Sequence, residues 1–394
     1  MRRFPLVLLV LLFIAASALA QPASPATGQH RPLRLVGYFF GKSARTGFSI
    51  SSAPLELLTE VIYSNARPDA DGNCKMSYPD VDSGNLMELR AFRESHPQFH
   101  ILLSVGGWSG SPFFSEIAAS RQKTLNFAAS CTQLVREYEL DGLDIDWEHP
   151  VNDGRKGSQR RPKDRENYVL LLKATRLALD EAAEKHLLLT VASAGYFSHL
   201  PDFAVGQMTP FVDWFNLMTY DLNDMNPCYT SHASALYAWK KQYRGRLAEK
   251  TPANANVAVR WYLTHGVPAE KIVLGAPFYG HKWTGVKASN RGLFQSFTVD
   301  ATTGDGLPYR VIAPMLRKEN IFWDDQTKAS WFYDARDRAF ISFDDARALK
   351  AKADYVLGQH LGGIMFWELS EDDAEFSLIK QLHHDLIRTH HLIQ

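Results

Sequence analysis

Alternating acidic and apolar side chains over residues 143–148 constrain this chain more than any other feature of its sequence. Asp144, Asp146 and Glu148 are each separated from the next by one apolar residue. A period of two is that of a β-strand, so the three carboxylates share one face. Like charges on one buried face repel one another and need a shared proton or a bound cation. So costly an arrangement favours a chemical role.

Eight apolar, strand-like runs recur along the chain and alternate with segments of helical spacing. The clearest helical segment is 164–185, whose apolar residues fall on one side. Strands joined by crossover helices predict a parallel sheet, and eight of them close a barrel, so the expected fold is an α/β TIM (β/α)8 barrel. The predicted strands are 33–39, 60–65, 100–105, 142–147, 186–192, 214–219, 271–276 and 363–367.

The connection between the seventh and eighth predicted strands is far longer than one helix requires. Residues 282–338 within it hold Gly, Thr and Asp turns and short aromatic runs, which indicate a small α+β insertion. The final crossover helix is expected at 343–358. No Pro/Ser-rich linker or terminal module is recognisable, so residues 31–394 are predicted to form one barrel domain that carries this inserted subdomain.

The N-terminal segment has the pattern of a secretory signal peptide, predicted over residues 1–20. Two arginines precede an apolar run from Leu6 to Ile14, and Ala18-Leu19-Ala20 supplies a small-x-small cleavage site. An uncleaved membrane anchor is the alternative, but the apolar run is short for a bilayer. Residues 21–30 are expected to be a flexible lead. The sequence therefore predicts export, with the protein secreted or periplasmic.

Charge and cysteine usage narrow the possible partners. The chain has 43 basic and 43 acidic side chains, which argues against nucleic acid or an anionic membrane as partner after signal cleavage. Cys74, Cys131 and Cys228 have no spacing typical of a metal site, so neither metal nor cofactor is expected. One disulfide with one thiol left over and three unpaired thiols are both compatible with the sequence. A monomer is expected.

Four blocks of sequence are associated with the predicted strands: Asp141-x-x-Asp144-x-Asp146-x-Glu148 on the fourth, Ser104-Val105-Gly106-Gly107 after the third, Met218-Thr219-Tyr220-Asp221 after the sixth, and Trp367 at the end of the eighth. Together these blocks resemble those of the chitinases of glycoside hydrolase family 18. The insertion at 282–338 is similar to the chitin-insertion domain of that family, and the resemblance extends over essentially the whole mature chain. It implies hydrolysis of β-1,4-linked N-acetylglucosamine polymers.

The resemblance also implies roles for individual residues in a retaining, substrate-assisted mechanism. Glu148 would be the general acid and base, and Asp146 would turn from Asp144 towards Glu148 to orient the substrate acetamide. Tyr220 would hydrogen-bond the acetamide carbonyl, and Trp367 would form the floor beneath the distorted sugar. The other residues implied to bind substrate or support the site are Asp221, Met218, Tyr38, Trp108, Gly107, Tyr279, His281 and Ser104.

Other interpretations of these residues stay open at this stage. Asp141 lies an odd number of residues before Asp144, so in a strand its side chain points to the face opposite the other acids. This favours a structural role for Asp141 at the start of the strand. The alternative interpretation of the three acids is a divalent-metal site or a structural cluster of ion pairs. His149 follows Glu148 where the family more often has Tyr. Alternative functions are an endo-β-N-acetylglucosaminidase acting on N-glycans and a non-catalytic chitin-binding lectin of the same fold. If His281 lies near the acids, activity should depend on pH between about 5 and 8.

Overall fold

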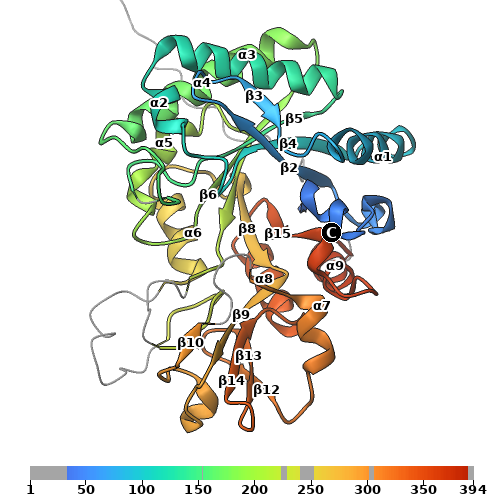
Figure 1. Ribbon diagram of the computed structural model, residues 1–394, viewed down its shortest axis with the longest axis vertical. Helices are drawn as coiled ribbons and strands as arrows, with labels where there is room; N and C mark the ends of the chain where they lie inside the picture. Colours follow the sequence, from blue (N-terminus) through green and yellow to red (C-terminus); the bar gives the residue numbers. More distant parts are fainter. Residues whose placement is uncertain (1–32, 153, 223–228, 240–252, 301–305, 389–394) are drawn as a thin grey trace, which may run out of the picture. The chain divides into compact units, whose positions relative to one another are not determined.

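Eight parallel strands close a barrel in the computed structural model, which describes residues 33–152, 154–222, 229–239, 253–300 and 306–388 (Figure 1). Each strand pairs with the next around the ring, and β15 pairs with β1 to close it, while the short β3 (Cys74–Met76) runs antiparallel beside β2. The predicted TIM barrel is thus confirmed. The barrel strands are β1 Arg34–Phe40, β2 Glu60–Pro68, β4 His100–Gly106, β5 Gly142–Asp146, β6 Leu188–Ala194, β7 Trp214–Met218, β8 Ile272–Pro277 and β15 Gly363–Trp367.

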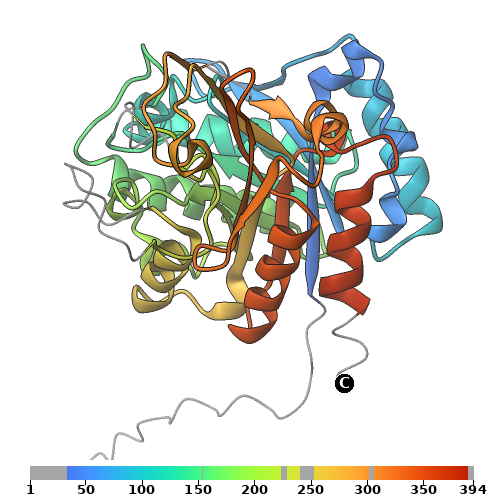
Figure 2. The ribbon, with the colours of Figure 1, turned by 90° about the horizontal axis from the view of Figure 1, so that it is seen from below.

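Helices follow most of the barrel strands, as the crossover pattern predicts. The helix expected at 164–185 forms and ends at Ala182, and it buries the predicted apolar side. After β1 the chain instead makes three short 3₁₀ turns within residues 41–57. Helices α8 and α9 pack against each other beside β1 (Figure 2). The helices are α1 Asp82–Ser95, α2 Phe114–Ala118, α3 Arg121–Glu137, α4 Asp164–Ala182, α5 Val205–Met208, α6 Ala255–Thr264, α7 Tyr309–Ile312, α8 Ala346–Gly358 and α9 Ser377–Leu382.

The barrel strands separate two apolar layers because successive side chains point to opposite faces. The outer layer lies between the strands and the helices and includes Leu143, Ile145 and Trp147 of the acidic segment. The inner layer fills the barrel with side chains of the opposite parity, such as Tyr38 and Met365. The apolar half of the acidic segment therefore anchors it to the outer core, and the acids face the interior.

A second, antiparallel sheet lies between β8 and α8 in the sequence. Its strands pair in the order β10-β9-β14-β13-β12, with β11 beside β9. It runs from Tyr279 to Phe343 and so extends past both ends of the predicted 282–338 insertion, whose status as a separate domain remains a prediction. Residues 339–343 form a strand, so helix α8 begins at Ala346 instead of Phe343. The strands are β9 Tyr279–Thr284, β10 Val299–Asp300, β11 Leu307–Pro308, β12 Ile321–Asp324, β13 Ala329–Asp334 and β14 Ala339–Phe343.

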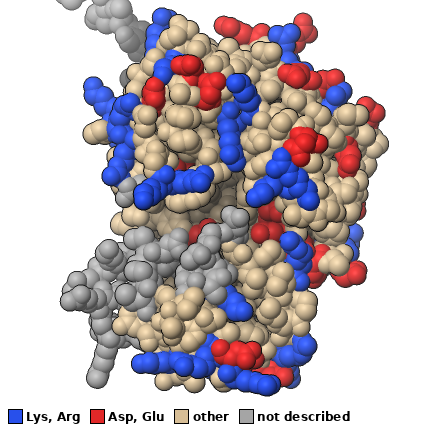
Figure 3. All heavy atoms as spheres, viewed as in Figure 1, with Lys and Arg blue, Asp and Glu red and all other residues tan. Residues whose placement is uncertain are grey.

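The structure resolves one choice that the sequence leaves open, because Cys74 of β3 is disulfide-bonded to Cys131 of α3. Cys228, the signal peptide at 1–20 and the lead at 21–30 lie outside the described residues. Within the described ranges, no helix is both long enough and apolar enough to span a bilayer. Basic and acidic side chains are interspersed on the face shown in Figure 3.

Candidate active site

The acids of strand β5 become more exposed from Asp144 to Glu148. Asp144 is completely buried and Asp146 is 6% exposed, and both face the barrel interior. The side chain of Glu148, two residues beyond the strand end, is 16% exposed. Only the last acid of the series thus opens towards solvent at the carboxyl-terminal rim, the end where barrels of this type place their active sites.

Asp144 accepts hydrogen bonds from side chains of three other barrel strands, β1, β6 and β7. Its Oδ1 accepts from the Thr190 hydroxyl at 2.6 Å and the Asn216 amide at 3.1 Å, and its Oδ2 accepts from the Tyr38 hydroxyl at 2.9 Å. Ser104 stands opposite Asp144 in strand register. Burial raises the pKa of Asp144, and these four hydroxyl and amide groups offset that rise only in part. Asp144 is therefore rigidly placed.

Asp146, in contrast, lacks such partners. Its Oδ1 is buried and accepts no hydrogen bond from any described residue. Burial, then the charge on Glu148 and the charge on Asp144, raise the pKa of Asp146 well above its usual range. A Cβ added at Gly107, which has φ +82°, would come within 3.5 Å of its Oδ2. Gly107 thus borders a carboxyl group that needs either a proton or a donor from elsewhere.

Glu148 is placed by its backbone at the end of the acidic segment. Its N–H donates to the Ser111 hydroxyl at 3.0 Å, and that hydroxyl also donates to the Asp146 carbonyl. Burial first, and then the charge on Asp221, raise the pKa of Glu148 to about 7, against a lowering by the backbone N–H of Trp108. A carboxyl group with this pKa can exchange protons near neutral pH.

Asp221 lies at the centre of a polar cluster beside Glu148. The Tyr279 hydroxyl donates to its Oδ1 at 2.7 Å, and Nε2 of His281 lies 2.6 Å from the same oxygen. Tyr220 and Tyr279 meet edge to face with centroids 6.1 Å apart. The structure therefore gathers these residues, predicted from two separate parts of the sequence, next to the acids.

Aromatic rings border the same end of the barrel. Trp367 is half-buried and packs on the inner layer, with its ring centroid 5.6 Å from Tyr38 and 5.8 Å from Phe40. Met218 packs on the same layer. Trp108 is 54% exposed, so its indole is free of the core. Tyr38 is buried beside Trp367, and its hydroxyl donates to Asp144.

Asp141 lies at the other end of β5, away from this cluster. It pairs with Arg93 at 2.6 Å and with Lys185 at 2.8 Å, and it accepts the Ile101 N–H at 3.0 Å. Burial would raise the pKa of Asp141, but Lys185, the Ile101 amide and Arg93 outweigh burial and lower it. This placement agrees with a structural role at the strand entrance.

Three polar residues of the site were missed in the sequence. Thr190 and Asn216 are polar side chains at inward-facing positions of otherwise apolar strands, and this parity is a signal that could have found them. Ser111 lies in a turn without a recognisable pattern. Within the described residues, no cluster of three or more His, Cys, Asp or Glu side chains has an arrangement that could hold a metal ion.

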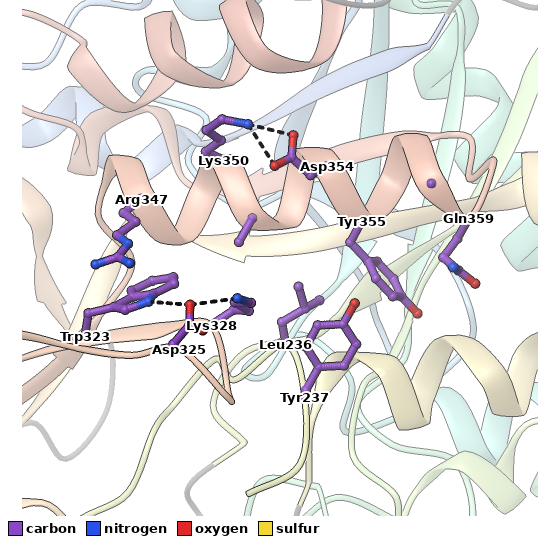
Figure 4. A pocket seen from close by; sticks show the side chains of 12 residues that line it. Leu236, Tyr237, Trp323, Asp325, Lys328, Arg347, Lys350, Asp354, Tyr355 and Gln359 are labelled. Atoms are coloured by element: carbon purple, nitrogen blue, oxygen red, sulfur yellow. Dashed lines mark hydrogen bonds and ion pairs between the residues drawn. The ribbon is translucent and has the colours of Figure 1, made fainter.

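Away from the acids, a pocket of about 420 Å³ lies between α8 and the β12–β13 hairpin, and none of the predicted site residues lines it (Figure 4). The Arg347 guanidinium covers the Trp323 ring at 4.2 Å along one wall. Tyr237 and Tyr355 meet edge to face at the other. Trp331, by contrast, is buried in the core of the second sheet.

Comparison with known proteins gives concordant matches over most of the chain. Residues 34–372 match the model described as glycosyl hydrolases family 18. The chain is 35% identical over 300 residues to Chitinase A1 of Niallia circulans. This alignment covers 74% of the chain but only 43% of Chitinase A1. The chain is also 30% identical over 386 residues to Endochitinase 1 of Metarhizium robertsii, and this alignment covers 91% of the chain and 87% of that protein. A solved structure of chitinase ChiA74 from Bacillus thuringiensis matches with a TM-score of 0.82 at 28% identity. The match covers 91% of this chain and 70% of the ChiA74 chain.

Proposed function

The chain belongs to the glycosyl hydrolases of family 18 and is a glycosidase, and from this premise we propose that it hydrolyses β-1,4-linked N-acetylglucosamine polymers, namely chitin and its oligosaccharides. The observation that carries the proposal is the graded acid series of β5. It combines a fixed buried Asp144, an Asp146 without a donor, and a rim-exposed Glu148 whose pKa is raised to about 7.

Glu148 is the proposed general acid and, later, the general base. Protonated near neutral pH, it donates its proton to the glycosidic oxygen as the bond to the leaving sugar breaks. As a carboxylate it then takes a proton from the incoming water. The exposure of its side chain at the rim supports this role, since the group must reach both substrate and solvent.

The substrate's own acetamide oxygen is the proposed nucleophile, and Asp146 is its positioning partner. The acetamide N–H would supply the donor that Asp146 lacks, and this bond orients the carbonyl oxygen towards the anomeric carbon. The other carboxylate near Glu148 is Asp221, which is held by Tyr279 and His281, and this favours substrate assistance over a carboxylate nucleophile. Tyr220 would bind the acetamide carbonyl, and Trp367 would pack beneath the sugar ring.

Incubation of the purified protein with the N-acetylglucosamine hexamer, followed by mass spectrometry of the products, tests the proposal. Wild-type protein should release shorter oligomers, and Glu148→Gln should lower kcat by about 10² to 10⁴-fold while still binding the hexamer. Activity should fall above pH 7, because deprotonation of Glu148 removes the acid. Product lengths at early times will separate cleavage within the chain from cleavage at its ends.

A high-mannose glycopeptide in a parallel reaction distinguishes the alternatives. Release of the glycan without cleavage of the hexamer would move the function to an endoglycosidase acting on N-glycans. If wild type and Glu148→Gln both bind the hexamer and neither reaction yields product, the protein is a lectin and the proposed role of Glu148 is wrong.

A further inference from the structure

A pair of stacked histidines lies directly beside the proposed acid. His149 follows Glu148 in the sequence and is 7% exposed. Its Nε2 is 3.7 Å from Oε2 of Glu148. Its ring stacks on that of His199, with the centroids 4.6 Å apart and the planes at 25°. One imidazole therefore contacts the acid, and a second imidazole covers the first.

The pair joins the chain after β5 to the chain after β6. His199 belongs to the segment that follows β6, and its Nδ1 lies 3.4 Å from Oδ2 of Asp202. The same Asp202 oxygen accepts the Asn152 side-chain amide at 2.6 Å, which ties the stack back to the segment that carries Glu148. The Tyr196 ring lies edge-on to His199 with centroids 6.0 Å apart. The stack is thus held from two sides.

The electrostatics of His149 are set by few groups. Glu148 faces it from its own segment and His199 faces it from the segment after β6, while Asp202 and Tyr196 lie behind His199. Burial first, and then the neighbouring His199, lower the pKa of His149 to about 3. His149 is therefore neutral over the range in which Glu148 titrates. A protonated imidazole in its place would stabilise the carboxylate and make Glu148 a poorer proton holder.

We propose that His149 is a positioning residue for Glu148: stacked on His199, it presents a neutral imidazole that fixes the direction of the acid's carboxyl group and preserves the alkaline limit of the activity. This inference rests on the proposed role of Glu148. It assigns a task to the position at which the chain departs from the Tyr more usual in the family. It also requires that His199 acts by covering His149 and not by contact with substrate.

Two substitutions at His199 separate covering from mere structural support. His199→Phe keeps a ring over His149, so its activity profile should match wild type on the alkaline side. His199→Ala exposes His149 to water, so that His149 can protonate, and the alkaline limit of kcat/KM for the hexamer should move down by about one pH unit. His265→Ala is the matched control, since His265 stacks on Trp261 with centroids 4.1 Å apart on α6, and its profile should not change.

His149→Phe tests the contact with the acid. It keeps a neutral ring stacked on His199 but removes the Nε2 that lies 3.7 Å from the Glu148 carboxyl group, so kcat should fall at every pH while KM is unchanged. Nuclear magnetic resonance of the imidazole protons supplies a readout that needs no substrate. The His149 signal, identified by its loss in His149→Phe, should not titrate between pH 5 and 8 in wild type and should titrate in His199→Ala.

The possible outcomes are distinct. An alkaline limit that stays in place in His199→Ala while activity falls equally at all pH values means that the stack is only structural, and it overturns the inference. So does a His149→Phe variant with wild-type kcat, or a His149 signal that titrates in wild type. If His199→Ala does not fold, the kcat of His149→Phe and the pH titration of the His149 signal in the wild-type protein still test the inference. Failure of the proposed function would appear separately, as an inactive wild type or an active Glu148→Gln.

Discussion

The two ends of strand β5 carry acids in opposite electrostatic states, although only a few residues separate them. At the amino end, Asp141 is paired with Arg93 and Lys185, and its pKa is lowered. At the carboxyl end, Asp146 has only other acids as charged neighbours, and its pKa is raised well above the usual range. The first arrangement stabilises the fold, and the second costs stability and keeps a proton available for chemistry.

Glu60 shows what makes the difference between the two ends. It also lies at the amino end of its strand, β2, but its basic neighbours Arg34 and His100 are 4.0 and 3.9 Å away. Burial raises the pKa of Glu60 to about 7, and the hydrogen bond from Thr59 and the charge on Arg34 do not offset it. A basic side chain at hydrogen-bonding distance, and not merely a hydroxyl donor or a more distant positive charge, is thus what lowers the pKa of a buried acid here.

The largest effect is expected at the carboxyl end. Asp146→Asn preserves the shape of the side chain but removes the carboxylate that would accept the acetamide N–H. We expect kcat for the hexamer to fall by about 10² to 10³-fold, with a smaller change in binding. Steady-state kinetics measure the change in kcat, and calorimetric titration with the hexamer measures the change in binding affinity. A variant with wild-type kcat would show that Asp146 does not orient the substrate.

A smaller effect, on stability, is expected at the amino end. Asp141→Asn leaves Arg93 and Lys185 without their carboxylate, so the free energy of unfolding should fall by about 2 to 3 kcal/mol at pH 7. The pKa of Asp141 is lowered in the folded protein, so its stabilisation is present above the unfolded pKa and is lost as pH falls through the folded pKa. Denaturant titrations should therefore show the full difference at pH 7 and a progressively smaller one as the pH is lowered below the unfolded pKa of the aspartate.

The smallest effect, and one of opposite sign, is expected for Glu60→Gln. The folded pKa of about 7 lies above the unfolded value near 4.5, so the contribution of Glu60 to stability is full below about pH 4.5 and is lost as pH rises through 7. The variant, which has no charge to bury, should be more stable than wild type at pH 8. At pH 4 the two proteins should unfold alike. Equal stability at both pH values would remove Glu60 from this comparison.

The sequence predicts what depends on local order and leaves open what depends on barrel closure. Alternation in residues 143–148 is a local property, so the strand and its inward-facing acids could be predicted directly from the sequence. The partners of Asp144 come from β1, β6 and β7, and only the strand register brings Tyr38, Thr190 and Asn216 to one carboxyl group.

The same limit applies to the outer contacts of the site. The stack of His149 on His199 depends on how the segments after β5 and β6 pack, and neither segment has a period that would predict it. The pairing of Cys74 with Cys131 requires β3 to lie against α3, which spacing alone does not encode. Strand ends, in contrast, differ from prediction by one or two residues at β1 and β6 and by at most three, at the carboxyl end of β2.

The disulfide bears on how the protein must be prepared. Cys74 and Cys131 are 57 residues apart, and the loop they close contains β4 and the turn with Gly106 and Gly107 that borders Asp146. Closing a loop of this length removes about 4 kcal/mol of chain entropy from the unfolded state. Material made in a reducing cytoplasm would lack this covalent tether, so a weakly active preparation could reflect its thiol state and not its active site.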